Sequence, residues 1–184
     1  MIKKNVKLIK DNSIVSGDCF TENDFHEMKI IFRQWIDINK RLKKLKGRAL
    51  NVPDILSEGL YCYYFNAVRT NNTAFSYDAV DISTGEGIQV KSTSIINDLT
   101  SFGPTSTWDK LIFMDFCPNI EVDGIIDFYL IPDESLYDII LNKKKNETFR
   151  DQQIAGKRPR LSIKKEFVNK MGLKPLKRIN LLED

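Results

Sequence analysis

The sequence predicts a single α/β domain in which helices flank a central mixed β-sheet. Its 184 residues match the usual size of one domain, about 100–200 residues. A composition of 42% hydrophobic and 29% charged residues is typical of a chain with a packed core. Helical periodicity comes first along the chain, followed by a hairpin pattern, two apolar strands and further helices. This order favours one sheet with helices packed around it.

A long amphipathic helix is expected near the N-terminus, after a short strand-like start. Thr21 is a suitable N-cap, and Gly47 can take the left-handed position after the helix. The apolar residues recur every three or four positions, as on one helix face: Phe25, Met28, Phe32, Trp35, Ile38, Leu42 and Leu45.

The middle of the chain predicts a helix, a hairpin and two buried strands. The helix should begin at Pro53 and continue to Val68, with Glu58 beside its apolar stripe. The hairpin should pair 75–82 with 88–94 across a Gly-rich turn. Residues 110–117 are so continuously apolar that they should lie in the middle of the sheet, and the next strand should occupy 124–132.

The C-terminal region predicts two short helices separated by a polar segment. Asp133 should cap a helix that ends at Leu141, and Ser162 should cap a basic helix ending near Gly172. The sequence shows no repeat and no linker. The expected organisation of 1–184 is therefore an N-terminal helical part (about 1–50), a core (about 51–142) and a basic C-terminal part (about 143–184).

Residue counts exclude several kinds of chemistry. One histidine, His26, rules out multi-histidine metal sites, and three widely spaced cysteines argue against a disulfide framework. Phosphate-binding glycine loops and nucleophile elbows are absent as sequence patterns. Neither a leader nor an apolar run long enough for a membrane is seen, so we expect a cytoplasmic protein without membrane contact.

Positive charge is concentrated in two places although the net charge is only +3. One cluster covers 40–48 and the other 157–178, each with at most one acidic residue. Such clusters suit a polyanionic partner, while the alternative is a solvated helix face. The helix dipole explains part of the first cluster without any partner.

Three side chains of the hairpin combine in a pattern with chemical meaning. Gln89 and Lys91 are two apart on one strand and therefore share a face, and Asp78 can approach them from the other strand. A carboxylate, an amide oxygen and an ammonium suit Mg²⁺ and a phosphate. Asp81 is the alternative carboxylate. Its side chain should point to the opposite face from Asp78, so it could join Gln89 and Lys91 only if a bulge intervenes.

This pattern resembles the PD-(D/E)XK nuclease superfamily, which has an acid on one strand, acid-x-Lys on the next, and often a Glu on the preceding helix. The matching residues are Asp78, Gln89, Lys91 and Glu58. The sequence departs from the pattern in having Tyr77 where Pro is common, and Gln89 where an acid is usual. The resemblance implies a restriction-endonuclease-like core, with Mg²⁺ held by Asp78, Gln89 and Glu58, and Lys91 as a further catalytic residue.

Two later segments resemble a small family of type II restriction endonucleases that cuts at GCNGC. They read TSFGPTSTWDK (100–110) and RDQQIAGKRPR (150–160). Their hydroxyl, amide and guanidinium groups suit phosphates and base edges, although both could be ordinary surface loops. The expected DNA contacts are Gln152, Gln153, Lys157, Arg158, Arg160, Ser101, Thr105 and Ser106.

The resemblance thus implies a bacterial type II restriction endonuclease that hydrolyses double-stranded DNA with Mg²⁺ and leaves 5′-phosphates. A palindromic site would be matched by a homodimer. Two alternatives remain open at this point. One is a structure-specific repair nuclease such as a junction resolvase, and the other is a nonenzymatic DNA-binding module, which the departure at Gln89 would suit.

Overall fold

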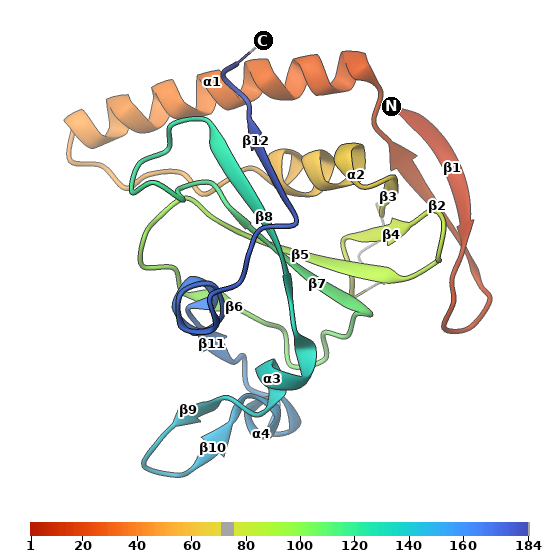
Figure 1. The fold of residues 1–184 in the computed structure, drawn as a ribbon, viewed down its shortest axis with the longest axis vertical. Helices are drawn as coiled ribbons and strands as arrows, with labels where there is room; N and C mark the ends of the chain where they lie inside the picture. Colours follow the sequence, from red (N-terminus) through yellow and green to blue (C-terminus); the bar gives the residue numbers. More distant parts are fainter. Residues whose placement is uncertain (71–75, 184) are drawn as a thin grey trace.

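A computed structural model describes residues 1–70 and 76–183 of the chain, and its main element is a mixed sheet of eight strands (Figure 1). Neighbouring strands are antiparallel except for one parallel pair, β5 and β7. The predicted α/β fold class with a mixed sheet is therefore confirmed. In spatial order the strands are β1 (Ile2–Lys7), β2 (Ile14–Cys19), β3 (Ala67–Thr70), β4 (Ala79–Asp81), β5 (Gly87–Thr93), β7 (Lys110–Asp115), β8 (Ile125–Ile131) and β12 (Lys177–Asn180).

The smaller elements lie mainly at the end of the molecule opposite α1 (Figure 1). Two short antiparallel ribbons join β6 (Thr100–Ser101) to β11 (Arg160–Leu161) and β9 (Ile140–Asn142) to β10 (Glu147–Thr148). The helices of this region are α3 (Asp133–Tyr137), α4 (Phe149–Ile154) and the π-helix η2 (Lys164–Asn169).

Helix α1 (Glu22–Lys44) has the N-terminus that the sequence predicts. Thr21 and Asp24 form a capping box that satisfies backbone N–H groups of the first turn. At the other end, the left-handed position is one residue earlier than predicted: Lys46, with φ of 56°, occupies it instead of Gly47. Gly47 is the next residue of the same C-terminal capping motif, and its N–H donates to the Leu42 carbonyl at 2.8 Å.

The middle of the sheet is covered on both faces, which explains why strand β7 is continuously apolar. In β7, Ile112 and Met114 pack under α1 and α2, whereas Leu111 and Phe113 pack against the C-terminal helices. This double burial confirms that 110–117 supplies a central strand. A third cluster, built from Val6, Leu8, Val15, Val68 and Val80, joins the N-terminal hairpin to the sheet.

The second predicted helix is shorter than expected. It comprises the π-helix η1 (Ile55–Gly59) and α2 (Leu60–Tyr64), and it ends before Val68. Asn66 adopts a φ of 51°, which turns the chain, and Ala67 begins β3, where burial in the sheet outweighs the helical pattern. The extension to Val68 was therefore wrong. The predicted hairpin is confirmed as β4 and β5, although Phe75 at its start lies outside the described residues.

The C-terminal predictions were partly correct. Ser162 does cap its helix, because its Oγ accepts from the Lys165 N–H at 3.0 Å. Asp133 does not cap α3: its carboxylate accepts a 3.0 Å hydrogen bond from the Trp108 indole, and the helix stops at Tyr137 instead of Leu141. The segment 143–160, expected to be turn-like, contains α4, which the buried Phe149 anchors.

None of the helices in the described ranges has the length and apolar character needed to cross a bilayer.

Candidate active site

Asp78 and Gln89 lie opposite each other just beyond the last paired residues of β4 and β5, where Ala79 faces Ile88. The Gln89 side-chain amide donates a hydrogen bond to Asp78 Oδ2. The same carboxylate oxygen accepts from the Val90 N–H at 2.7 Å. Strand β5 thus holds Asp78 by both a side chain and a backbone group, as the hairpin pattern predicts.

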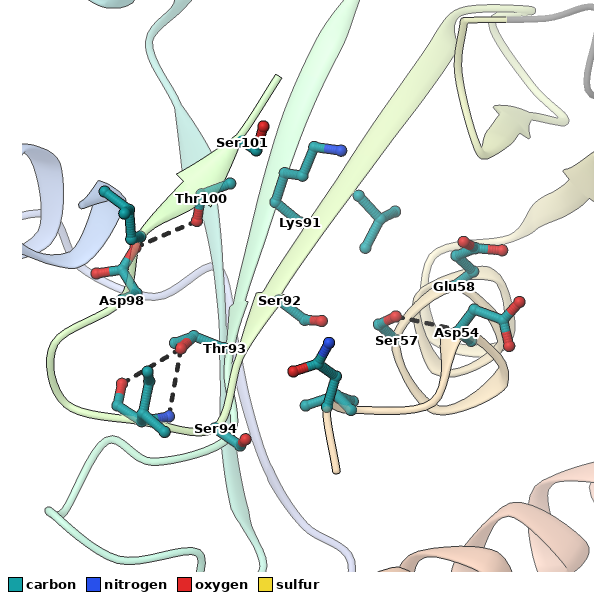
Figure 2. Close-up of a pocket in the computed structure, with 15 residues that line it drawn as sticks. Asp54, Ser57, Glu58, Lys91, Ser92, Thr93, Ser94, Asp98, Thr100 and Ser101 are labelled. Atoms are coloured by element: carbon teal, nitrogen blue, oxygen red, sulfur yellow. Dashed lines mark hydrogen bonds between the residues drawn. The ribbon is translucent and has the colours of Figure 1, made fainter. Parts of the chain in front are cut away.

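Lys91 and Glu58 border a cavity of about 420 Å³ between strand β5 and helix η1. Figure 2 shows Lys91 on the strand side of this space, with Ser57 and Glu58 on the helix that faces it. The hydroxyl groups of Thr93 on β5, and of Thr100 and Ser101 on β6, also line the cavity. The structure therefore brings Asp78, Gln89, Lys91 and Glu58 to one region, although they come from three different elements.

Arg69 also belongs to this region and is absent from the sequence-based prediction. Its Nε donates to Glu58 Oε2 at 2.6 Å, and its Nη2 lies 2.9 Å from Asp54 Oδ2. The residue sits on β3, one position after Val68, where the predicted helix was expected to end. A predicted strand over 67–70, next to β4, would have placed the Arg69 guanidinium near the carboxylates of Asp78 and Glu58.

Burial dominates the electrostatics of these groups. It raises the pKa of Asp78, against the opposing effects of the Val90 N–H and Lys91. It also raises the pKa of Glu58, where Arg69 lowers the value and the neighbouring Asp78 charge raises it. For Lys91, burial lowers the pKa, while Asp78 and Glu58 favour the ammonium. Two carboxylates and a lysine are thus held partly desolvated and within electrostatic reach of one another.

The available donors suit a hard cation. In the described parts of the chain, His, Cys, Asp and Glu form no group of three that could hold a metal ion. The groups that could coordinate a metal ion are the carboxylates of Asp78 and Glu58 and the Oε1 atom of Gln89, and all of them are oxygen ligands. Mg²⁺ needs only one or two protein carboxylates, because it retains waters and binds substrate phosphates. The residues therefore fit this ion.

Asp81, the alternative carboxylate, has another role in the structure. Its Oδ1 accepts from the backbone N–H groups of Ser83 and Thr84 at 2.8 and 2.9 Å, which closes the turn between β4 and β5. These contacts are those of an Asx-type turn.

The two segments expected to contact DNA lie side by side in the fold. Arg160 pairs with Ser101 between β11 and β6, and the Phe102 N–H donates to the Pro159 carbonyl at 3.0 Å. Phe102 in turn lies under the Lys91 ammonium, 5.7 Å from the ring centroid. The 100–107 and 150–160 segments are therefore adjacent to each other and to the cavity.

Their side chains differ in accessibility. Arg158, Arg160 and Thr105 are exposed, whereas Ser106 is half-buried and the Ser101 hydroxyl is buried in the cavity wall without a hydrogen-bond partner in the described structure. The remaining three make internal contacts: Gln152 and Lys157 bind Glu147, and Gln153 donates to the Gly103 carbonyl at 3.0 Å.

The second basic cluster is less available than its sequence suggests. Lys164 is buried and forms a 2.6 Å ion pair with Asp115, and Arg178 pairs with Asp127 at the same distance. The accessible charge of the C-terminal region is therefore smaller than the count of its basic residues.

Comparison with known proteins identifies relatives across most of the chain. The model of the Bsp6I restriction endonuclease family matches residues 20–170. The type II restriction enzyme Bsp6I of Bacillus sp. (strain RFL6) is 30% identical over 149 residues, which cover 80% of this chain and 82% of that enzyme. No solved structure gives a significant match.

Together with the fold and the site, these matches define the class of the protein as a type II restriction endonuclease, a site-specific deoxyribonuclease. The chain belongs to the Bsp6I restriction endonuclease family. This membership agrees with the two resemblances seen in the sequence, to the nuclease superfamily and to a GCNGC-cutting family. It favours a restriction enzyme over the two alternatives, a junction resolvase and a nonenzymatic DNA-binding module.

Proposed function

We propose that this restriction endonuclease hydrolyses DNA with Mg²⁺ and leaves 5′-phosphate and 3′-hydroxyl ends, with Asp78, Gln89, Lys91 and Glu58 as its catalytic residues. The observation that carries the proposal is the meeting of β5 and η1 at the cavity, with Asp78 held by the Gln89 amide and the Val90 N–H.

Each residue contributes a distinct property. Asp78 and Glu58 supply negatively charged oxygens for Mg²⁺, and Gln89 keeps Asp78 in place and offers a neutral oxygen. When bound, Mg²⁺ would lower the pKa of a water and neutralise charge on the phosphate. Lys91, with a pKa lowered by burial, is suited to orient the attacking water, accept its proton, or offset charge that develops on phosphorus.

Recognition is assigned to the segments around β6 and β11. Arg158 and Arg160 are exposed guanidinium groups next to the cavity and suit guanine edges, whereas Ser101, Thr105 and Ser106 suit phosphates. Gln152, Gln153 and Lys157 must first break their contacts within the protein before they can bind DNA. These contacts are with Glu147 and with the Gly103 carbonyl. GCNGC is the proposed site, cut by a homodimer in the bacterial cytoplasm.

Digestion of a plasmid of known sequence tests the proposal. We expect discrete fragments whose termini map to one short sequence, ligate without prior phosphorylation, and disappear when EDTA removes the metal. Undiminished cleavage in EDTA contradicts the metal dependence. Ends that lack a 5′-phosphate contradict the proposed direction of attack.

A further inference from the structure

Arg69 forms an ion pair with Glu58, a carboxylate that lines the cavity. Its guanidinium donates through Nε to Glu58 Oε2 at 2.6 Å, and both side chains are about one-fifth exposed, at 21% and 19%. The second partner, Asp54, is on the rim and is 71% exposed. The inner ion pair is therefore the shorter of the two and the better shielded from solvent.

The backbone fixes this guanidinium in place. Arg69 pairs with Asp18 of β2 on one side and with Ala79 of β4 on the other, so its strand is held at both edges. The next residue, Thr70, donates its N–H to the Asp78 carbonyl at 2.9 Å. Strand β3 thus connects the position of Arg69 directly to the backbone of Asp78.

Apart from Asp54 on the rim, the inner groups of the site comprise equal numbers of acidic and basic side chains. These are Asp78 and Glu58 on one side and Lys91 and Arg69 on the other, so their formal charges cancel. A divalent cation therefore enters a site whose inner groups have no net charge. It must also share Glu58 with a guanidinium that already binds one of its two oxygens.

We propose that Arg69 is a positioning residue and internal counter-cation, which holds Glu58 at the cavity and competes with the divalent ion for this carboxylate. The inference rests on the proposed metal-dependent function. Arg69 then sets the metal concentration at which the enzyme becomes active, and it keeps the metal-free site charge-balanced.

Metal binding without DNA gives the direct test. Mn²⁺ is the probe, because its free-ion EPR signal is lost on binding. Replacing the guanidinium by a neutral side chain of similar length, Arg69→Met, should tighten Mn²⁺ binding about tenfold, which corresponds to roughly 1.4 kcal/mol of lost competition. Equal or weaker binding by a folded Arg69→Met protein overturns the proposal. If this variant does not fold by circular dichroism, Arg69→Gln, which keeps a donor for Glu58, takes its place with the same expectation.

Three further variants identify the origin of the effect. Asp54→Asn removes the rim partner of the same guanidinium and should not tighten Mn²⁺ binding; tightening here would contradict competition at Glu58. Arg69→Met should have no effect in a Glu58→Gln background, since the contested carboxylate is gone. Asp78→Asn should weaken binding. Unchanged Mn²⁺ affinity in Asp78→Asn refutes the proposed metal site itself, whereas weakening there without tightening in Arg69→Met refutes only the role of Arg69.

Discussion

Asp78 and Gln89 show how a single cross-strand contact limits what each residue can do. The Gln89 amide donates to a carboxylate that is half-buried and also receives the Val90 N–H. Gln89 itself is only 5% exposed. A neutral amide at this position therefore satisfies Asp78 without adding charge, which an acidic residue there could not do in the absence of a metal.

Removal of either of two proposed catalytic groups should abolish cleavage but preserve DNA binding. Asp78→Ala removes the carboxylate proposed to bind the metal, and Lys91→Ala removes the ammonium beside the cavity. We expect cleavage to fall by at least about 100-fold in both, with cognate binding in Ca²⁺ nearly unchanged. Asp81→Asn is the control, since its carboxylate only closes the β4–β5 turn. Loss of activity in Asp81→Asn with activity retained in Asp78→Ala would move the site to Asp81.

Gln89→Glu should make folding more dependent on metal. The new carboxylate would face Asp78 in a buried place, and the free energy of unfolding should fall by about 2 kcal/mol at pH 8 without metal. Mn²⁺ should raise the melting temperature more than in the wild type. Because such a pair has a pKa raised in the folded state, the penalty applies at high pH and should shrink toward pH 5. A variant as stable as the wild type in EDTA at pH 8 would contradict this account.

The sequence was sufficient to predict which side chains meet when they are close in the chain. Asp78, Gln89 and Lys91 belong to one hairpin, whose short turn fixes the register and hence the shared face. Arg69 was missed because 67–68 continue the apolar helical spacing. Only the pairing of β3 with β2 and β4, a non-local contact, selects a strand there.

At the level of elements, hydrogen bonds of Asp98 connect the C-terminal helix η2 to the loop between β5 and β6, which lines the cavity. This buried carboxylate accepts hydrogen bonds from Ser162 Oγ and from the Ile163 N–H, the latter at 2.8 Å. It also binds Thr100, which lines the cavity. Ser162 could be predicted as a cap from its local sequence, but its second partner, 64 positions earlier in the chain, could not.

Lys164 should be a stabilising residue and not a DNA contact. It pairs with Asp115, whose side chain is 1% exposed, and donates to the Cys117 carbonyl at 2.7 Å. Lys164→Met leaves the Asp115 charge buried and unpaired, which should cost about 3–5 kcal/mol of unfolding free energy. Urea denaturation measures this. The exposed neighbour provides the control, because Lys165→Met should change stability by less than about 0.5 kcal/mol. Comparable losses in the two variants would refute the assignment.

At the scale of the whole molecule, the residues proposed for catalysis and for recognition belong to different sheets. Gln89 and Lys91 lie on the eight-stranded sheet and Asp78 directly before its strand β4, whereas the segments proposed to contact DNA meet at the separate β6–β11 ribbon. The fold class followed from the order of sequence patterns, because the hairpin and the two continuously apolar strands after it, β7 and β8, are long enough to be detected. The ribbon did not, since two-residue strands leave no periodicity to detect.

Arg158 and Arg160, in and just before strand β11, should affect DNA binding differently from lysines elsewhere. Arg158→Ala or Arg160→Ala should reduce the preference for cognate over scrambled duplex by about 1–3 kcal/mol. Lys43→Ala, at the end of α1, should weaken both complexes equally and lower the salt slope by about one unit if it contacts phosphate. Titrations at several salt concentrations compare them. Equal proportional losses on both duplexes in the two arginine variants would transfer base reading to 100–107.

The separate β6–β11 ribbon has a consequence for how such enzymes diversify. Its two strands branch from the chain between β5 and β7 and again before η2, so neither interrupts a strand of the main sheet. Substitutions at its exposed Arg160, or at Arg158 in the exposed loop before it, leave the register that aligns Asp78 with Gln89 intact, whereas Thr100 and Ser101 also line the cavity. On the proposed assignment of roles, a new target sequence is expected to arise through these two exposed arginines while the hydrolytic centre on the sheet is retained.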